Sequence, residues 1–224
     1  MFEQLTLPTN PPTPGYLHKP GQPNNAAVVL THGAGANCHS KLLVSISEAL
    51  AACGFTVFRF DLPFRQARPY GPPHPGTAAA DREGLRQTAA QMKLFMKGPQ
   101  RSSAASRVVL GGHSYGGRQA SMLLAENPEA ADALLLLSYP LHPPNKPTQL
   151  RTKHFPQLTK PALFVQGTRD PFATIEELSL ALQQIPAAHH LLQIENAAHD
   201  LQPKKSPIDI PTQIATELAS FMNL

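Results

Sequence analysis

A serine that lies between two glycines directly follows an apolar run, and no other pattern constrains the fold of this chain as strongly. Residues 108–117 read VVLGGHSYGG, so Gly112 and Gly116 lie two positions on either side of Ser114. A β-branched run, a G-x-S-x-G turn and a following helical pattern indicate a strand, a sharp turn and a helix. Glycines are needed because the turn brings neighbouring backbone too close for a Cβ atom. Ser114 is therefore predicted to be a nucleophile, provided that a base and an orienting acid lie nearby.

Strand and helix patterns alternate along the rest of the chain. The predicted strands are residues 26–31, 55–60, 107–111, 133–138, 162–166 and 190–194. Apolar residues recur with helical spacing in the segments that follow the first three predicted strands and in those that follow the last two. This alternation predicts an α/β fold with a mostly parallel central sheet and helices on both faces.

Local signals mark where the predicted helices begin and end. Gly54 is expected to end the first helix, and Gly98-Pro99 the second. Thr77 is expected to cap the second helix, and a Thr174-x-x-Glu177 capping box opens a later one. Pro211 is expected to start the last helix, because proline is tolerated in a first turn.

The prolines mark the connecting segments. The 24 prolines cluster near the N-terminus, around 63–75 and around 140–161. We expect residues 61–76 to form a loop, and residues 1–25 to be irregular or to hold one or two short edge strands. Proline inside a helix costs about 3 kcal/mol or more. The interval 139–161 is therefore not expected to form a helical cap, and only a short helical turn fits between residues 148 and 155.

Composition indicates one globular domain that spans residues 1–224. Hydrophobic residues make up 42% of the chain and charged residues 15%. The net charge is +4, but the basic residues are scattered, so no nucleic-acid partner is expected. No apolar run approaches the roughly 20 residues that span a bilayer, and the first residues lack a secretory pattern. We expect a cytoplasmic protein without membrane association. The sequence leaves open whether it has oligomeric partners.

The two cysteines do not indicate a disulfide or a metal site. Cys38 and Cys53 are expected to lie in one helical segment, too far apart along it to bridge. Neither belongs to a pattern with metal-ligand spacing. This usage is typical of a reducing compartment.

An acid and a base follow two later predicted strands. Asp170 comes just after strand 162–166, and His199 just after strand 190–194. The carboxyl ends of strands in open α/β sheets face a common crevice, so both side chains are expected to meet Ser114 there. His199 would take the serine proton, and Asp170 would hold the imidazole tautomer. Asp200 and Asp132 are the alternative acids, but neither follows a strand end in the required order.

Backbone donors for a developing oxyanion are also predicted. The N–H of Tyr115 is supplied by the turn itself, and the N–H of Ala34 by the small-residue loop HGAGA at 32–36. One such donor stabilises a transition state by roughly 3–4 kcal/mol. His32 is expected to hold this loop by hydrogen bonds and to take no part in the chemistry.

Several other polar residues allow two interpretations. Arg65 and Arg68, with Arg59 and Asp61 nearby, are candidates for binding an anionic group of the substrate; alternatively, this set forms ion pairs that fix the loop. Arg118 is expected to brace a loop carboxylate. The phosphate-binding glycine motifs of nucleotide sites are missing from the sequence. We expect no metal ion and no organic cofactor.

Four segments together resemble the α/β-hydrolase superfamily: HGAGA, GHSYGGR, GTRDPF and AHD. The stretch RFDLPFR, together with GHSYGGR, resembles a group that contains testis-expressed proteins and KANL-type chromatin-complex subunits. This group is often placed with dienelactone-hydrolase-like proteins. The resemblance spans residues 26–222. Dienelactone hydrolases proper use a cysteine nucleophile where this chain has Ser114, so their particular reaction is not carried over.

These observations predict a serine hydrolase with an uncapped α/β-hydrolase fold. The expected reaction is hydrolysis of a small ester or thioester through an acyl-Ser114 intermediate, with a small-molecule acyl substrate as partner. A serine peptidase or an acyltransferase is the alternative within catalysis, because the same three residues serve either. A protein-interaction scaffold is the alternative outside catalysis. A scaffold has no physical need for the serine, the histidine and the aspartate together, which favours the enzyme.

Overall fold

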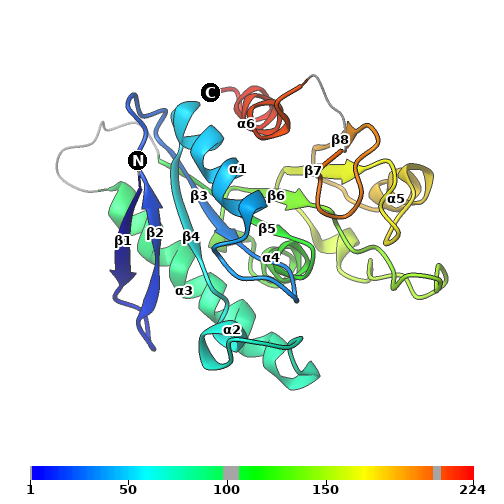
Figure 1. Cartoon of the computed structure of the whole chain (residues 1–224), viewed down its shortest axis with the longest axis horizontal. Coiled ribbons are helices and arrows are strands. Elements are labelled where there is room, and N and C mark those ends of the chain that lie inside the picture. Colours follow the sequence, from blue (N-terminus) through cyan, green and yellow to red (C-terminus); the bar gives the residue numbers. More distant parts are fainter. Residues whose placement is uncertain (1, 98–105, 204–207) are drawn as a thin grey trace.

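The computed structural model describes residues 2–97, 106–203 and 208–224, and an eight-stranded sheet runs through them (Figure 1). The strand order is β1-β2-β4-β3-β5-β6-β7-β8. The strands are β1 (Phe2–Leu7), β2 (Thr13–His18), β3 (Ala26–Thr31), β4 (Thr56–Phe60), β5 (Arg107–His113), β6 (Ala133–Leu137), β7 (Ala162–Gly167) and β8 (His189–Ile194). All six predicted strands are present, with ends that differ from the prediction by no more than a few residues.

The sheet is parallel except at one edge. Each neighbouring pair from β4 to β8 is parallel, which confirms the predicted sheet type. β2 runs antiparallel to β4, and β1 runs antiparallel to β2. The N-terminal residues therefore form a hairpin of two edge strands, one of the two arrangements expected for residues 1–25.

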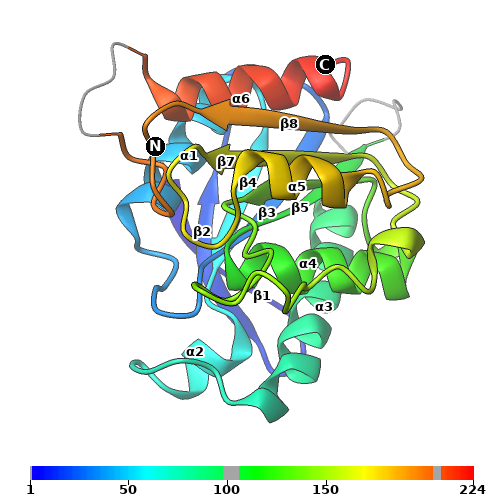
Figure 2. The ribbon, with the colours of Figure 1, turned by 90° about the vertical axis from the view of Figure 1, so that its right-hand side faces the viewer.

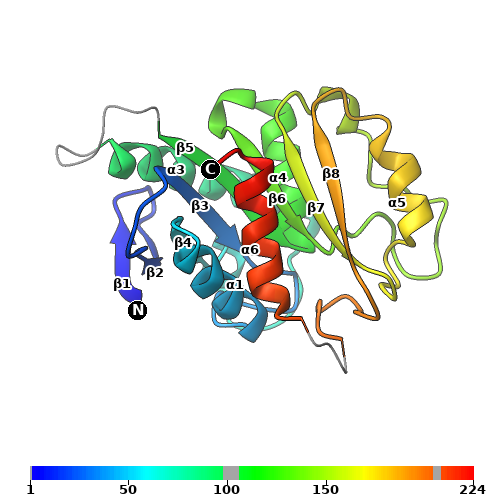
Figure 3. The same cartoon turned by 90° about the horizontal axis from the view of Figure 1, so that it is seen from above.

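Helices cover both faces of the sheet (Figures 2 and 3). α1 (Lys41–Ala52) and α6 (Ile210–Phe221) pack side by side on one face. α3 (Ala78–Met96), α4 (Tyr115–Glu126) and α5 (Ile175–Leu182) contribute to the core on the other face. Because side chains alternate along a strand, Val108 and Leu110 of β5 enter one core while Val109 enters the other. Burial on both faces explains why β3 and β6 are continuous apolar runs without polar alternation.

The helix ends agree with the predicted signals at three points and differ at one. The helix α1 ends just before Gly54, the Thr174–Glu177 capping box is present, and Pro211 lies in the first turn of α6. Thr77 precedes α3 but does not cap it. It already lies in a 3₁₀ turn, Pro75–Thr77, and its hydroxyl donates to the His74 carbonyl at 2.8 Å. The predicted end at Gly98-Pro99 lies outside the described residues.

Two further expectations from the sequence are wrong in part. The segment 61–76 is not all loop, because it holds the short helix α2 (Pro63–Ala67), in which proline takes the first position that tolerates it. Cys38 lies in the connection before α1, whereas Cys53 follows its last residue. The two cysteines therefore do not share a helix, and both are free thiols.

The interval 139–161 forms no helical cap. Every residue in it is described, and its only helical piece is the 3₁₀ turn Phe155–Gln157. This result confirms the uncapped architecture expected from the prolines.

A buried arginine attaches the N-terminal hairpin to the parallel part of the sheet. Arg59 in β4 is only 1% exposed, and its Nε donates to His18 Nε2 on β2 at 3.0 Å. Its guanidinium lies over the ring of Tyr16, 4.3 Å from the ring centroid, and donates to the carbonyl of Cys38. Burial, and to a smaller extent the positive charge of Arg59, lower the pKa of His18 to about 4. His18 is therefore a neutral acceptor in the folded protein.

This arrangement predicts a pH-dependent contribution to stability. Between pH 6.5 and 4 the unfolded chain protonates His18 and the folded chain does not, so the free energy of unfolding falls on acidification. The variant His18→Gln keeps an acceptor for Arg59 and does not titrate. We expect wild type to lose on the order of 2 kcal/mol more than His18→Gln between pH 7.5 and 4.5 in urea titrations. Equal losses in the two proteins would contradict the assignment of a neutral His18.

Candidate active site

Ser114 lies on a strained turn between β5 and α4. Its backbone has φ 50° and ψ −114°, a conformation rarely adopted by residues other than glycine. A Cβ atom on Gly112 would lie 2.5 Å from Gly117 N, and one on Gly116 would lie 2.6 Å from the His32 carbonyl oxygen. The structure thus confirms the predicted reason for both glycines. The turn presents the serine at the carboxyl end of the sheet.

The structure brings Ser114, His199 and Asp170 together. His199 Nε2 lies 2.8 Å from Ser114 Oγ, and His199 Nδ1 lies 2.8 Å from Asp170 Oδ2. The Asp170 side chain is fully buried, while 23% of the His199 side chain is exposed. The carboxylate is shielded from solvent, and the imidazole is partly accessible to it. A serine, a histidine and a buried carboxylate that are hydrogen-bonded in this order can activate the serine for attack on a carbonyl.

The loops after β7 and β8 hold Asp170 and His199 against each other. Gly167 ends β7 so close to the second loop that a Cβ atom would lie 2.4 Å from the Ala197 carbonyl oxygen. That carbonyl accepts the N–H of Arg169 at 2.9 Å. Asp170 Oδ1 accepts the backbone N–H of Phe172 at 2.9 Å. Because each carboxylate oxygen has its own donor, the oxygen that faces His199 is fixed.

Two rings enclose the imidazole of His199. The Phe172 ring lies 4.3 Å away between centroids, and the His113 ring 5.0 Å away. His113 Nε2 donates to the His199 carbonyl at 2.7 Å, and burial lowers the pKa of His113 to about 4. His113 is therefore a neutral packing residue.

The alternative acids lie elsewhere. Asp200 is exposed, and its Oδ1 accepts the N–H of Gln202 at 3.1 Å. Asp132 lies at the opposite end of the sheet, where it accepts the N–H of Val108 at 2.7 Å. Neither carboxylate contacts the ring of His199.

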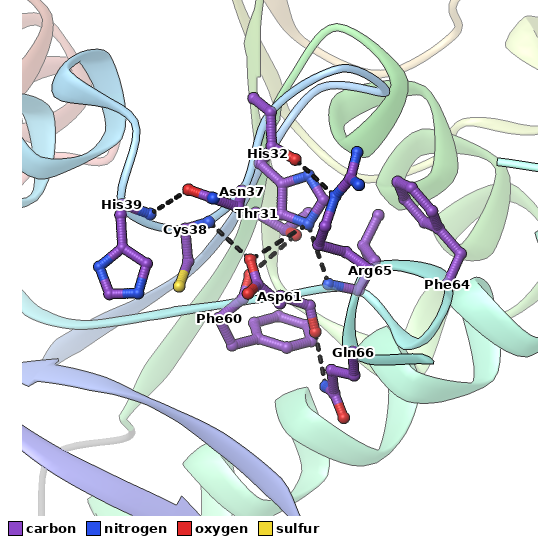
Figure 4. A network of polar contacts seen from close by, with 12 residues as sticks. Thr31, His32, Asn37, Cys38, His39, Phe60, Asp61, Phe64, Arg65 and Gln66 are labelled. Atoms are coloured by element: carbon purple, nitrogen blue, oxygen red, sulfur yellow. Dashed lines mark hydrogen bonds and ion pairs between the residues drawn. The ribbon is translucent and has the colours of Figure 1, made fainter. Parts of the chain in front are cut away.

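The HGAGA loop passes beside the serine turn. A Cβ atom on Gly33 would lie 3.4 Å from Ser114 Cβ. His32 supports this loop from within the fold: Nδ1 donates to the Gly33 carbonyl at 2.8 Å, and Nε2 accepts the N–H of Leu62 at 3.1 Å. Burial lowers the pKa of His32, which suits an imidazole that both donates and accepts. Figure 4 shows the ring between the loop and the segment that follows β4.

Arg65 fixes the same loop from α2 (Figure 4). Its Nη2 donates to the Ala34 carbonyl at 2.8 Å and its Nε to the Ala36 carbonyl at 2.9 Å. The same guanidinium also donates to the carbonyls of Arg68 and Gly71, and the side chain is buried. These contacts show that Arg65 fixes the loop through backbone carbonyls and not through the ion pairs considered above; contact of Arg65 with substrate stays a prediction.

Other residues near this loop complete the network. Asp61 Oδ1 accepts the N–H of Cys38 at 2.6 Å, and Gln66 Nε2 donates to the Asp61 carbonyl at 2.6 Å (Figure 4). Arg68 is turned toward its own loop, where its Nη1 lies 2.9 Å from His74 Nε2 and its Nη2 donates to the Pro72 carbonyl. Substrate contact by Arg68 stays a prediction.

A buried carboxylate that the sequence reasoning missed supports the turn from the other side. Asp81 on α3 accepts the Tyr115 hydroxyl at 2.7 Å and the N–H of Phe64 at 2.9 Å. Burial raises the pKa of Asp81 and also that of Tyr115. One signal was available: Asp81 lies in helical register with the buried Leu85, so a carboxylate occupies the apolar stripe of α3.

The expectation for Arg118 is wrong. No carboxylate contacts it among residues 2–97, 106–203 and 208–224, and its Nε is buried without a hydrogen-bond partner. The same described residues contain no cluster of histidine, cysteine and carboxylate side chains that could hold a metal ion. Nor do they contain a helix with the length and apolarity needed to cross a membrane.

Comparison with known proteins agrees with this geometry. The family described as "Alpha/beta hydrolase domain" matches residues 24–223. The chain therefore belongs to the alpha/beta-hydrolase family, and its fold is dienelactone-hydrolase-like.

Three solved structures illustrate the likeness. Dienelactone hydrolase from Anabaena variabilis ATCC 29413 is 20% identical with a TM-score of 0.72, over 100% of this chain and 97% of that one. XC6422 from Xanthomonas campestris, described as an a/b serine hydrolase without lid, is 17% identical with a TM-score of 0.70, over 99% and 94%. The esterase domain of a Rhodothermus marinus protein is 18% identical with a TM-score of 0.68, over 99% and 97%. At these identities the likeness establishes the fold alone.

Proposed function

We propose that this protein is a serine hydrolase that cleaves small esters or thioesters. The hydrogen-bonded chain from Ser114 Oγ through His199 to the buried Asp170 carries the proposal. Ser114 Oγ attacks the substrate carbonyl while His199 Nε2 takes the serine proton. The same proton then goes to the leaving alcohol or thiol as the acyl-serine forms. Water repeats the sequence and releases the acid.

Backbone N–H groups are proposed to stabilise the oxyanion in each step. The Tyr115 N–H begins α4, and the Ala34 N–H belongs to the loop that passes beside Ser114. Arg65 supports this placement by binding the Ala34 carbonyl, which limits rotation of the adjoining peptide units. Preorganised donors of this kind reduce the reorganisation needed in the transition state.

The open surroundings of Ser114 favour short acyl groups. The interval 139–161 adds no helical wall above the serine, and a long acyl chain would lie in water. XC6422, which has a similar fold, is described as lacking a lid. A serine peptidase or an acyltransferase is the second candidate, because the same three side chains serve either reaction. A cytoplasmic location and the lack of a nucleic-acid or membrane partner stay predictions.

A chain-length series with and without a covalent inhibitor tests the proposal. We expect kcat/KM for p-nitrophenyl esters to be highest at two to four acyl carbons, an estimate from the open site, and to fall for longer chains. Prior treatment with a fluorophosphonate should abolish hydrolysis and add one phosphonyl group at Ser114, located by peptide mass spectrometry. No labelling of Ser114, or an optimum at long chains with interfacial activation, would contradict the proposal.

A further inference from the structure

Arg118 holds an unpaired charge one helical turn from Ser114. Its backbone N–H donates to the Ser114 carbonyl at 3.0 Å, so the residue begins the second turn of α4. Its Nε is buried without a partner, and no hydrogen bond or ion pair to its guanidinium occurs within the described residues. The residue as a whole is partly buried, but an N–H donor that is buried without an acceptor costs free energy, because it has lost water and gained no hydrogen bond in return.

Among the described residues, Arg151 is a second arginine without a carboxylate partner, and it is hydrogen-bonded to the segment that follows β6. Arg151 Nη1 donates to the Pro140 carbonyl at 3.2 Å, and the Arg151 carbonyl accepts the Tyr139 hydroxyl at 2.7 Å. Tyr139 follows β6, whose Leu137 carbonyl accepts the N–H of Ser114 at 2.8 Å. Both arginines therefore lie on segments that border the nucleophile. Burial lowers the pKa of Arg151, and the positive charge of Arg118 also lowers it.

The other groups packed around Arg118 do not neutralise it. His154 Nε2 lies 2.8 Å from Ser121 Oγ on α4, and burial and the nearby arginines lower the pKa of His154 to about 4. Arg82 on α3 already has a carboxylate, because its Nε donates to Glu126 at 3.1 Å. In the part of the chain that the structure describes, the net charge beside Arg118 is therefore positive.

We propose that Arg118 and Arg151 form a subsite for an anionic group, a carboxylate or a phosphate, on the substrate of Ser114. The proposal rests on the proposed function and narrows its substrate class to esters or thioesters with a negative charge on the acyl or leaving part. A guanidinium presents planar, forked donors that match carboxylate and phosphate oxygens. Two guanidinium groups without a counter-ion attract an anion, and the bound anion stabilises their positive charges.

Matched charged and neutral esters test this subsite. The p-nitrophenyl monoester of glutaric acid and p-nitrophenyl pentanoate have five-carbon acyl groups and differ mainly in the terminal carboxylate. We expect wild type to have the higher kcat/KM for the glutarate ester. In Arg118→Gln or Arg151→Gln the ratio of the two kcat/KM values should fall about tenfold or more, since hydrogen bonds to charged groups are strong. The exposed Arg86, which pairs with Glu83 on α3, supplies the control Arg86→Gln, whose ratio should match wild type.

Ligand binding supplies a readout that does not need turnover. In the Ser114→Ala background, calorimetry with glutarate in one arm and inorganic phosphate in the other should show saturable binding of at least one anion. The arm that binds more tightly identifies the anionic group, and Arg118→Gln should abolish that binding. A wild-type ratio at or below one, an unchanged ratio in both arginine variants, or no binding in either arm would overturn the subsite. Absence of hydrolysis of both esters would instead contradict the proposed function.

Discussion

We expect Ser114→Ala to lower kcat/KM for p-nitrophenyl butyrate by about four orders of magnitude or more and to leave the melting temperature close to that of wild type. The only described hydrogen bond of the Ser114 hydroxyl is to His199 Nε2 at 2.8 Å, so its removal takes nothing from the core. Alanine also tolerates the φ of 50° as well as serine does. Steady-state kinetics and thermal unfolding check both expectations.

Ser45→Ala is a matched control for this change. Its hydroxyl donates to the Leu42 carbonyl within α1 and takes no part in the crevice around Ser114. That variant should retain wild-type activity. If Ser114→Ala kept more than about one hundredth of wild-type turnover, an acyl-serine mechanism would be excluded.

Asp170→Asn should lower kcat/KM by about three to four orders of magnitude. Asp170 Oδ1 accepts the N–H of Phe172, so the amide oxygen of asparagine will keep that contact and its NH₂ group will face His199. An NH₂ group facing Nδ1 favours the tautomer with the proton on Nε2, and that nitrogen then cannot accept the proton of Ser114. The loss is therefore expected in kcat, with the fold retained.

The neighbouring carboxylate, Asp200, provides a control for the effect of Asp170→Asn. Asp200→Asn changes an exposed side chain that accepts the N–H of Gln202, and it should leave kcat/KM within about twofold of wild type. A larger loss in Asp200→Asn than in Asp170→Asn would move the role of orienting acid to Asp200.

The parts of the fold that were predictable are those in which local sequence and burial agree. The strands β3 and β6 are uninterrupted apolar runs because both of their faces are covered, and turn residues delimit each of them. The serine turn was predictable for a similar reason. Only glycine fits where Gly112 and Gly116 approach other backbone atoms. The close approach of the backbone at this turn can therefore be predicted from these two residues.

The parts that were not predictable depend on contacts between distant segments. A proline at position 63 is compatible with a loop and also with the first residue of a helix. Contact between α2 and α3 decides between these two structures. Arg65 was a candidate either for binding substrate or for fixing its loop by ion pairs, and its hydrogen bond to the carbonyl of Ala34, 31 residues away, was not foreseen. Arg118 was expected to have a carboxylate partner, and none of the described residues supplies one. The identity of a side chain's partner is a property of the tertiary structure.

The position of α6 has a consequence for synthesis on the ribosome. Its residues Ile214 and Leu218 pack into the core beside α1, and the Met222 carbonyl accepts Arg107 Nη1 from the start of β5. A nascent chain that has emerged only as far as residue 203 already holds Ser114, Asp170 and His199, but one face of its sheet lacks the cover of α6. Apolar side chains exposed at that stage are open to chaperones and to other chains. Folding of this domain is thus tied to the emergence of α6, even though every residue of the candidate triad precedes it.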